Sequence, residues 1–385
     1  MVPGLPEGLL RRVRDRLAAR GEDPTPARVA AALRAEAGVI GDAEVLRAAA
    51  VLRAELAGLG PLEPLLADPA VTDVLVNGPD AVWVDRGEGL ERTAVRLPDE
   101  AAVRRLACRL AVAAGRRLDD ASPSVDAPLP GGLRLHAVLP PVAVPGTLLS
   151  LRVPARRPFA LPDLVAAGTV PPVLAQVLRR LVEARRSFLV SGGTGTGKTT
   201  LLSCLLGLVP PDERVLLVED SGELAPEHPH VVRLQARRGN VEGAGEVGLG
   251  DLVRQALRMR PDRLVVGEVR GAEVVDLLAA LNTGHEGGCG TLHANSAHDV
   301  PARLEALGVA AGLSREAVHS QVAAAVDVVV HLVRPRGGAR RVDAVCVVER
   351  GPGGLVEVAA AHDAAGRPGP GAARLAALLD RPVHG

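Results

Sequence analysis

The sequence predicts an α/β protein: a mainly parallel sheet covered by helices, preceded by a smaller α/β domain and a helical N-terminal region. Two observations indicate this fold class. Between about residues 160 and 350, short apolar runs alternate with amphipathic helical segments, and a glycine-rich loop follows the first run. Such alternation is typical of parallel sheets with helices on their faces. A chain of 385 residues has room for two or three domains.

The first 154 residues divide into two regions. Residues 1–57 show apolar residues at helical spacing, and GLGPLEPLL then interrupts the pattern with Gly and Pro. Residues 58–154 mix both periods. TDVLVN, AVWVD, RLHAVLPP and TLLSLRV predict strands, and DEAAVRRLACRLAVAAG predicts a helix with an acidic first turn. We therefore expect an α/β domain over residues 58–154.

Residues 155–350 form the third predicted domain, after a Pro- and Arg-rich linker, PARRPFALPD. Its expected strands are SFLVS, RVLLVED, RLVVGE, CGTLH, DVVVHLV and VDAVCVV. DLVRQALRMR and EVVDLLAALN are expected helices between them. Residues 351–385 are rich in Gly, Pro and Ala, and we expect a tail in which only AARLAALL is helical.

Composition excludes several classes of function. The formal net charge is zero, and the chain holds 2 Phe, 1 Trp and no Tyr. Proteins that bind single strands need basic grooves and aromatic rings, so no specific nucleic acid partner is expected. The 4 cysteines are scattered, and the first twenty residues lack the apolar core of a signal peptide. A cytoplasmic protein is expected.

The strongest motif is SGGTGTGKTT, which fits the phosphate-binding pattern G-x-x-x-x-G-K-[ST] from Gly192 to Thr199. Its glycines allow backbone N–H groups to surround phosphate oxygens. We expect Lys198 to reach the β- and γ-phosphates of ATP, and the hydroxyl of Thr199 to bind Mg²⁺. The predicted nucleotide-binding residues are Gly192, Gly193, Thr194, Gly195, Thr196, Gly197, Lys198, Thr199 and Thr200.

Two acidic strand ends follow this loop. The run RVLLVED ends in Glu219 and Asp220, which would either face the metal or cap the next segment. The run LVVGE lacks a strand-end Asp, because Gly267 occupies that place, so support of the metal falls to the strand that ends in Glu219 and Asp220. Glu268 is then the expected base for the attacking water; the alternative is an acid at the start of the following helix.

His293 ends the run CGTLH in a Gly-rich setting, where it would hydrogen-bond a γ-phosphate; His285 has the weaker case. Arg134 and Arg152 stand among apolar residues in strands of the second domain. A strand arginine needs an anionic partner, either a phosphate or a structural carboxylate. Another set of arginines has no assigned direction: Arg233, Arg237, Arg254, Arg258 and Arg260.

Together these motifs resemble the type II/IV secretion ATPase family, nearest the branch that drives Tad/Flp pilus assembly. GGTGTGKTT, LLVEDSGEL, LRMRPDRLVVGEVRG and TGHEGGCGTLHANS stand in that family's order. The resemblance implies a RecA-like P-loop ATPase domain behind a smaller α/β (PAS-like) domain, with nucleotide between them. It also implies catalytic roles for Lys198, Glu219, Glu268 and His293, and charge neutralisation by Arg134 and Arg152.

The same resemblance implies a homohexamer that uses ATP and Mg²⁺ at the inner face of the cytoplasmic membrane, acting on platform proteins of a pilus or secretion system. A conjugation-type ATPase that exports DNA or protein fits these motifs equally. A RecA-like DNA translocase and a nucleotide-binding scaffold without turnover are less favoured, because aromatic residues are scarce and the expected catalytic residues are present.

Overall fold

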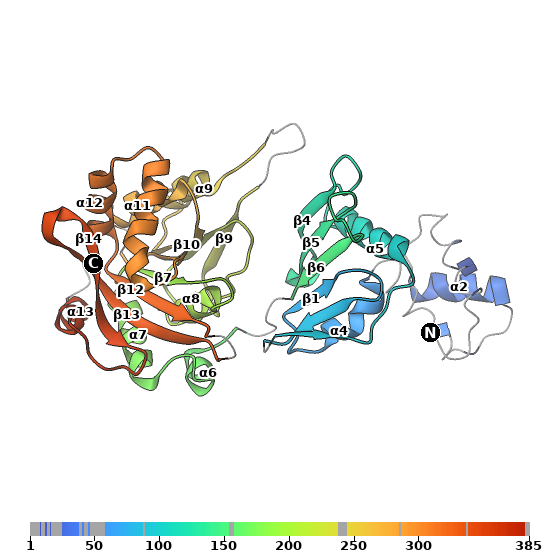
Figure 1. Ribbon diagram of the computed structural model, residues 1–385, viewed down its shortest axis with the longest axis horizontal. Coiled ribbons are helices and arrows are strands. Elements are labelled where there is room, and N and C mark those ends of the chain that lie inside the picture. Colours follow the sequence, from blue (N-terminus) through green and yellow to red (C-terminus); the bar gives the residue numbers. More distant parts are fainter. Residues whose placement is uncertain are drawn as a thin grey trace. The chain divides into compact units, whose positions relative to one another are not determined.

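The computed structural model describes residues 8, 12–13, 16, 25–37, 41, 45–46, 58–87, 89–153, 158–237, 245–284, 286–335 and 338–381. The chain divides into two compact units, Met1–Arg156 and Arg157–Gly385. We call them the N-terminal and C-terminal units and describe each by itself (Figure 1).

The N-terminal unit contains a six-stranded antiparallel sheet of order β3-β2-β1-β6-β5-β4. Its strands are β1 (Asp73–Val76), β2 (Val82–Asp85), β3 (Leu90–Arg92), β4 (Ser124–Pro128), β5 (Arg134–Val138) and β6 (Leu148–Arg152). Its described helices are α2 (Pro26–Ala37), η1 (Gly60–Leu62), α4 (Glu63–Ala67), α5 (Glu100–Ala113) and η2 (Pro130–Gly132). The apolar face of α5, with Val103, Leu106 and Leu110, joins the core of this sheet.

Most predicted elements of this unit are present. Helix α5 begins as expected, because the Asp99 carboxylate accepts a hydrogen bond from the Ala102 N–H at 2.6 Å. Strands β3 and β4 were not predicted: all three β3 residues are exposed, and the alternation in β4 is too short to be a signal, with only Val125 and Ala127 buried. Of the helical region predicted over residues 1–57, α2 is described, while most of the remainder lies outside the described residues.

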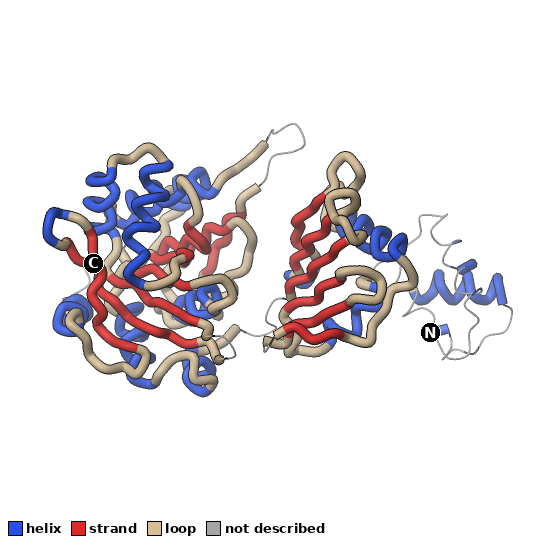
Figure 2. The backbone as a smooth tube through the Cα atoms, in the orientation of Figure 1, coloured by secondary structure: helices blue, strands red, loops and turns tan. Residues whose placement is uncertain are grey.

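The C-terminal unit is built on an eight-stranded sheet of order β14-β13-β12-β7-β11-β10-β8-β9 (Figure 2). Its strands are β7 (Phe188–Gly192), β8 (Val215–Glu219), β9 (Val231–Gln235), β10 (Arg263–Val269), β11 (Cys289–His293), β12 (Val328–Val333), β13 (Arg341–Arg350) and β14 (Val356–Asp363). From β12 to β9 every pair is parallel, and β13 and β14 are antiparallel additions. The mainly parallel sheet is as predicted.

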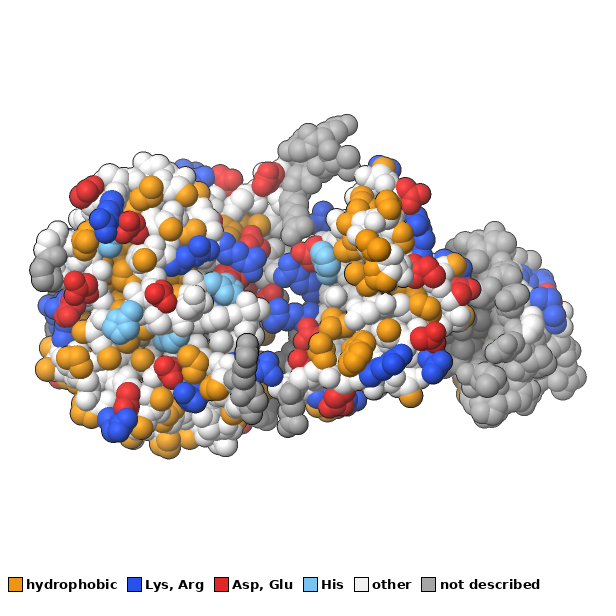
Figure 3. Space-filling model, in the orientation of Figure 1, with side chains coloured by type: hydrophobic (Ala, Val, Ile, Leu, Met, Phe, Trp, Pro, Cys, Tyr) orange, Lys and Arg blue, Asp and Glu red, His pale blue; other side chains and the backbone are white. Residues whose placement is uncertain are grey.

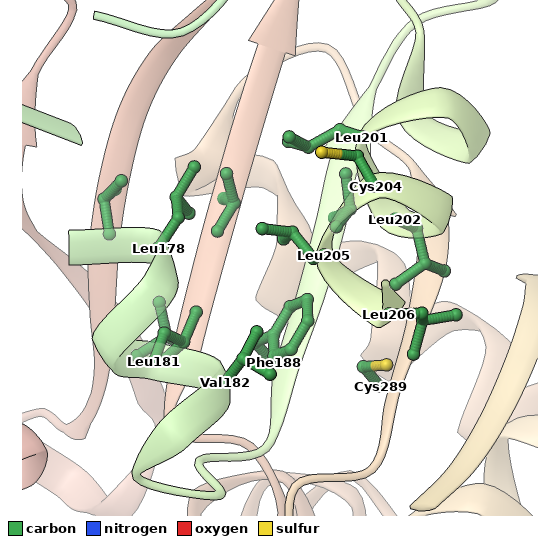
Figure 4. Packing of buried hydrophobic residues seen from close by; sticks show 14 of the residues in the cluster. Leu178, Leu181, Val182, Phe188, Leu201, Leu202, Cys204, Leu205, Leu206 and Cys289 are labelled. Carbon is green, nitrogen blue, oxygen red and sulfur yellow. The ribbon is translucent and has the colours of Figure 1, made fainter. Parts of the chain in front are cut away.

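Helices cover both faces of this sheet. The helices of one face are α6 (Leu161–Ala166), α7 (Pro172–Glu183), α8 (Lys198–Leu206) and α13 (Ala372–Leu379). Those of the other face are α9 (Leu249–Leu257), α10 (Glu273–Leu281), α11 (Val300–Ala310) and α12 (Arg315–Ala325). Along β7, Phe188 and Val190 pack on the first face and Leu189 on the second, which is the period-2 alternation of a strand. Figure 4 shows the side chains of α7 and α8 meeting over β7.

The helix predicted at AARLAALL is present as α13 (Ala372–Leu379), but the expectation of an irregular tail from residue 351 up to that helix is wrong. Strand β14 pairs with β13 from Ala344↔Asp363 to Arg350↔Val356, after a short turn, η4 (Pro352–Gly354). Helix α13 then returns to the core through Leu375 and Leu378. The prediction failed because β14 is rich in alanine, which has a low strand propensity, and pairing with a long neighbouring strand overrides that preference.

The surface of the C-terminal unit mixes side chains of both signs with apolar ones on the face shown in Figure 3. Within the described parts of the chain, no helix combines the length and the apolar character that crossing a membrane requires.

We expect Leu178→Ala on α7 to destabilise the protein by about 2–5 kcal/mol, because Leu178 is fully buried against β7 and α8. Thermal unfolding monitored by circular dichroism gives the comparison. Val173→Ala on the same helix is the control, since Val173 is 52% exposed. Equal melting temperatures for the two variants would contradict this account of the core.

Candidate active site

Five parallel strands bring their carboxyl ends to one edge of the large sheet, in the order β12-β7-β11-β10-β8. Ligands of open α/β sheets bind at this edge. The strand ends carry Gly192 on β7, His293 on β11, Glu268 on β10 and Glu219 on β8. The sheet therefore gathers the residues that the sequence assigned to phosphate binding, metal support and hydrolysis.

The phosphate-binding loop joins the fully buried strand β7 to α8, as predicted. Gly195 and Gly197 adopt positive φ angles of 72° and 96°. Gly192 has φ 149°, and a Cβ there would lie 2.4 Å from the carbonyl oxygen of Leu332 on β12. The loop thus requires glycine for its conformation and for close approach to β12. The unbonded N–H groups of the first α8 turn suit an anion.

Lys198 begins α8 and is buried. Its Nζ donates to the carbonyl oxygens of Gly192 at 3.1 Å and Gly193 at 3.0 Å, and lies 3.4 Å from Nε2 of His293. Burial lowers the pKa of Lys198, and the Glu268 carboxylate partly opposes that shift. The ammonium is therefore held at the mouth of the loop, between the loop carbonyls and β11.

Glu268 and His293 are in direct contact, with Oε1 and Nε2 2.5 Å apart. Glu268 lies inside β10, one residue before its end, at an irregularity where Val266 pairs with Gly290 but Val269 pairs with Leu292. One extra residue on β10 turns the Glu268 side chain toward β11. The Thr291 hydroxyl donates to the Gly267 carbonyl at 2.7 Å and ties the bulge to β11. Burial first, then Lys198, lower the pKa of His293, which favours its neutral form.

Glu219 is a buried carboxylate at the end of β8. Its Oε1 accepts hydrogen bonds from the N–H groups of Glu223 at 2.9 Å and Leu224 at 2.8 Å. Burial raises the pKa of Glu219 to about 7 in spite of these bonds. A Cβ at Gly267 would lie 2.7 Å from Glu219 Cγ. Gly267 therefore makes room for the Glu219 side chain. This packing explains why residue 267 of β10 is a glycine, with no side chain of its own.

The donor set fits Mg²⁺ held mainly by a nucleotide. Among the described residues, no three His, Cys, Asp or Glu side chains converge on a metal-sized site. Mg²⁺ usually keeps several waters and takes one or two protein ligands beside substrate phosphates. The hydroxyl of Thr199, in the first turn of α8, is suited to be such a ligand. Glu219 is farther from the loop, because β11 and β10 lie between β7 and β8, so it is suited to hydrogen-bond the waters of the metal.

Arg134 and Arg152 lie in the N-terminal unit, directly opposite each other on β5 and β6. Facing residues of an antiparallel pair share one side of a sheet, and two like charges there need an anion. Arg134 has one within its own unit: its Nε and Nη2 donate to both Asp126 oxygens, at 2.9 and 2.7 Å. The structural carboxylate left open by the sequence is thus present for Arg134.

Several other arginines serve as structural partners. Arg254 of α9 donates to Asp276 of α10 at 2.9 Å and to Asp251 of its own helix at 2.5 Å. Arg237 donates to the Gly245 carbonyl at 2.6 Å, and Arg233 lies 4.0 Å from Glu219 while donating to the Leu224 carbonyl. Arg258 and Arg260 are exposed near the end of α9, and His285 lies outside the described residues.

Sequence reasoning missed three groups at this edge. Arg270 contacts the Glu268 carboxylate, two residues away. Ser191 and His331 form a buried hydrogen bond of 2.9 Å beneath the loop, and only the register of β7 against β12 places them together. Arg303 of α11 lies beside His293. A pocket of about 330 Å³ is lined by Gly193, Thr194, His293, Ala294, Asn295, Asp299 and Arg303. The sequence could have indicated Arg270, because it stands two residues after Glu268. It gives no sign of the other two groups.

Residues 55–368 match the model of the family described as "Type II/IV secretion system protein". The chain belongs to this family. The match confirms the predicted family resemblance. Membership of this family also confirms the prediction that the chain is an ATPase. Placement in the Tad/Flp branch stays a prediction.

Relatives and solved structures agree with this membership. A putative conjugal transfer protein of Mycobacterium tuberculosis is 59% identical over 330 residues, which cover 84% of this chain and 94% of that protein. The conjugal transfer protein TrbB of Rhizobium radiobacter is 32% identical and covers 74% of this chain and 85% of its own length. The ATPase DotB of Yersinia pseudotuberculosis shares the fold, with a TM-score of 0.55 at 18% identity over 76% of this chain and 78% of that one.

We expect Gly267→Ala to destabilise the secretion-family protein by about 1–3 kcal/mol, because the added Cβ overlaps the buried Glu219 side chain. Gly222→Ala is the matched control, since a Cβ there meets no atom within 4 Å. Thermal melts of both variants test the packing. A Gly267→Ala melt as high as that of the control would mean that Glu219 does not need this space.

The buried carboxyl of Glu219 predicts a pH effect on stability. Its pKa rises from an ordinary 4.5 to about 7 on folding, so the folded state binds more protons between these values, and stability falls as pH rises through that window. Without nucleotide or Mg²⁺, the free energy of unfolding of Glu219→Gln should exceed that of wild type by an amount that grows from pH 5 to pH 8 and reaches about 3 kcal/mol. Thermal melts at each pH measure the difference. The exposed Glu227→Gln is the control. A difference that stays constant with pH would refute the assignment.

Proposed function

We propose that this protein is an ATP-hydrolysing motor of a pilus or secretion apparatus, in which Lys198, His293 and Glu268 carry out hydrolysis. The observation that supports it is their mutual contact: Lys198 Nζ lies 3.4 Å from His293 Nε2, which lies 2.5 Å from Glu268 Oε1. Helix α8 supplies Lys198, and strands β11 and β10 supply His293 and Glu268, so the three groups meet beside the phosphate-binding loop. A nucleotide seated in that loop places its terminal phosphate next to all three.

In the proposed reaction, the loop amides and Lys198 hold the β- and γ-phosphates. Glu268 accepts a proton from a water molecule while the water oxygen attacks the γ-phosphorus. The bond between the γ-phosphorus and the oxygen that bridges it to the β-phosphate then breaks, which leaves ADP and inorganic phosphate. Neutral His293 donates its N–H to a γ-phosphate oxygen and orients the group. Mg²⁺, when bound through Thr199 with Glu219 supporting its waters, neutralises charge on the phosphates.

The N-terminal unit is proposed to complete the site. Arg134 and Arg152 present two guanidinium groups on one side of its sheet, and arginines directed at a transferred phosphate are worth roughly 10³–10⁵-fold in P-loop hydrolases. To contact the phosphate, the Arg134 guanidinium must exchange its hydrogen bonds to Asp126 for hydrogen bonds to the phosphate. Hydrolysis would then depend on closure between units, which is how turnover becomes movement.

The proposed working form is a homohexamer that acts on platform proteins at the cytoplasmic face of the inner membrane. The 59% identical mycobacterial protein is described as a putative conjugal transfer protein, and TrbB is a conjugal transfer protein. Export of DNA or protein by a conjugation-type system is therefore the second candidate. The order of motor residues is shared by both candidates. Neighbouring genes for prepilins, or for conjugation components, distinguish them.

We expect Glu268→Gln to lower the ATPase rate by about 10²–10⁴-fold while ATP binding persists, because glutamine retains the shape of the side chain but accepts no proton. A coupled phosphate-release assay measures the rate, and calorimetry measures binding. Glu227→Gln, an exposed carboxylate away from the strand ends, should hydrolyse ATP like wild type. Wild-type turnover by the Glu268 variant would remove this residue as the base.

A further inference from the structure

The order of strands at the active edge gives the nucleotide a direction. The hydrolytic groups His293 and Glu268 lie on β11 and β10, to one side of the phosphate-binding loop. Strand β12 lies on the other side, and Leu332 pairs directly with Gly192. If the γ-phosphate reacts beside β11, as the proposed function requires, the rest of the nucleotide must lead away from β11. The turn that follows β12 emerges at the same edge, next to the loop.

Two arginines of the β12–β13 turn lie against the phosphate-binding loop. Arg340 Nε donates to the Gly195 carbonyl oxygen at 3.0 Å, and its Cδ lies 3.5 Å from where a Cβ would stand at Gly197. Arg334 Nη1 lies 3.9 Å from the corresponding Cβ position of Gly195. Both arginine side chains therefore lie near the loop at Gly195 and Gly197, and they come from the turn after β12, whereas Glu268 comes from β10.

The composition of the chain suggests what these guanidinium groups bind. A purine is commonly held by stacking, and aromatic rings are the usual surface for it. The chain has only 2 Phe, 1 Trp and no Tyr. Phe188 is buried at the amino end of β7, Phe159 precedes α6 outside any strand, and Trp83 belongs to the N-terminal unit. A planar guanidinium offers the alternative surface, because arginine stacks on ring faces with cation–π attraction.

We propose that Arg334 and Arg340 form the wall of the nucleotide site that contacts the purine ring of ATP or ADP. This inference rests on the proposed function for the direction of the nucleotide. The contact is with the ring rather than with the phosphates, which the loop amides and Lys198 already surround. It gives the site its preference for a nucleotide over a bare polyphosphate.

The test compares ligands with and without a base. Full-length wild type, Arg334→Ala and Arg340→Ala are titrated with ATP, ADP and inorganic tripolyphosphate by isothermal calorimetry at fixed ionic strength and Mg²⁺. We expect each variant to weaken ATP and ADP about 5- to 30-fold while the tripolyphosphate Kd changes less than about twofold. Arg341→Ala is the matched control: the Arg341 side chain pairs with Asp343 of its own strand, β13, at 3.3 Å, and the variant should bind all three ligands like wild type.

Other outcomes overturn the proposal. Equal losses for ATP and tripolyphosphate would mean that the arginines hold phosphate or shape the loop, and unchanged binding of ATP would mean that they touch no nucleotide. Melting temperatures within about two degrees of wild type exclude misfolding as a cause. The titration with ADP measures binding without turnover, so a wild type that binds ADP but does not hydrolyse ATP would refute the proposed function alone.

Discussion

The arrangement of the active edge depends on one constraint: parallel strands of one sheet end on the same side. Strands β12, β7, β11, β10 and β8 obey it, and residues separated by more than a hundred positions in the chain become neighbours. The order of strands then fixes which group faces which. Across the sheet lie, in order, the two arginines after β12, the phosphate-binding loop, His293, Glu268 and the buried carboxylate of Glu219. This order of functional groups is a consequence of the strand topology rather than of any one motif.

Buried packing sets the finer geometry. Glu219 fits only because β10 has no side chain at Gly267, and Glu268 reaches His293 only because an extra residue interrupts the pairing of β10 with β11. Both features lie within four residues of sequence, Val266 to Val269. The local irregularity thus serves two acidic groups at once, making space for one and re-aiming the other.

Much of this could be predicted from the sequence, and the misses have physical causes. Most strands of the parallel sheet, the phosphate-binding loop and the acidic strand ends were readable because apolar runs and glycine spacing report local structure directly. Strand β9, which has no fully buried residue, was not predicted. Strand β14 was missed because its alanines carry no strand signal, and its pairing partner supplies the stability. Ser191 with His331, and Arg340 with Gly195, were missed because only sheet register brings residues about 140 positions apart into contact.

One feature of the loop bears on how the site fills. In this state the ammonium of Lys198 is bonded to the carbonyl oxygens of Gly192 and Gly193, two residues of the loop it belongs to. An incoming triphosphate must compete with those internal acceptors for the same three ammonium hydrogens. Affinity for the ligand therefore measures an exchange between two bonded arrangements of the same ammonium group, one with carbonyl oxygens and one with phosphate oxygens.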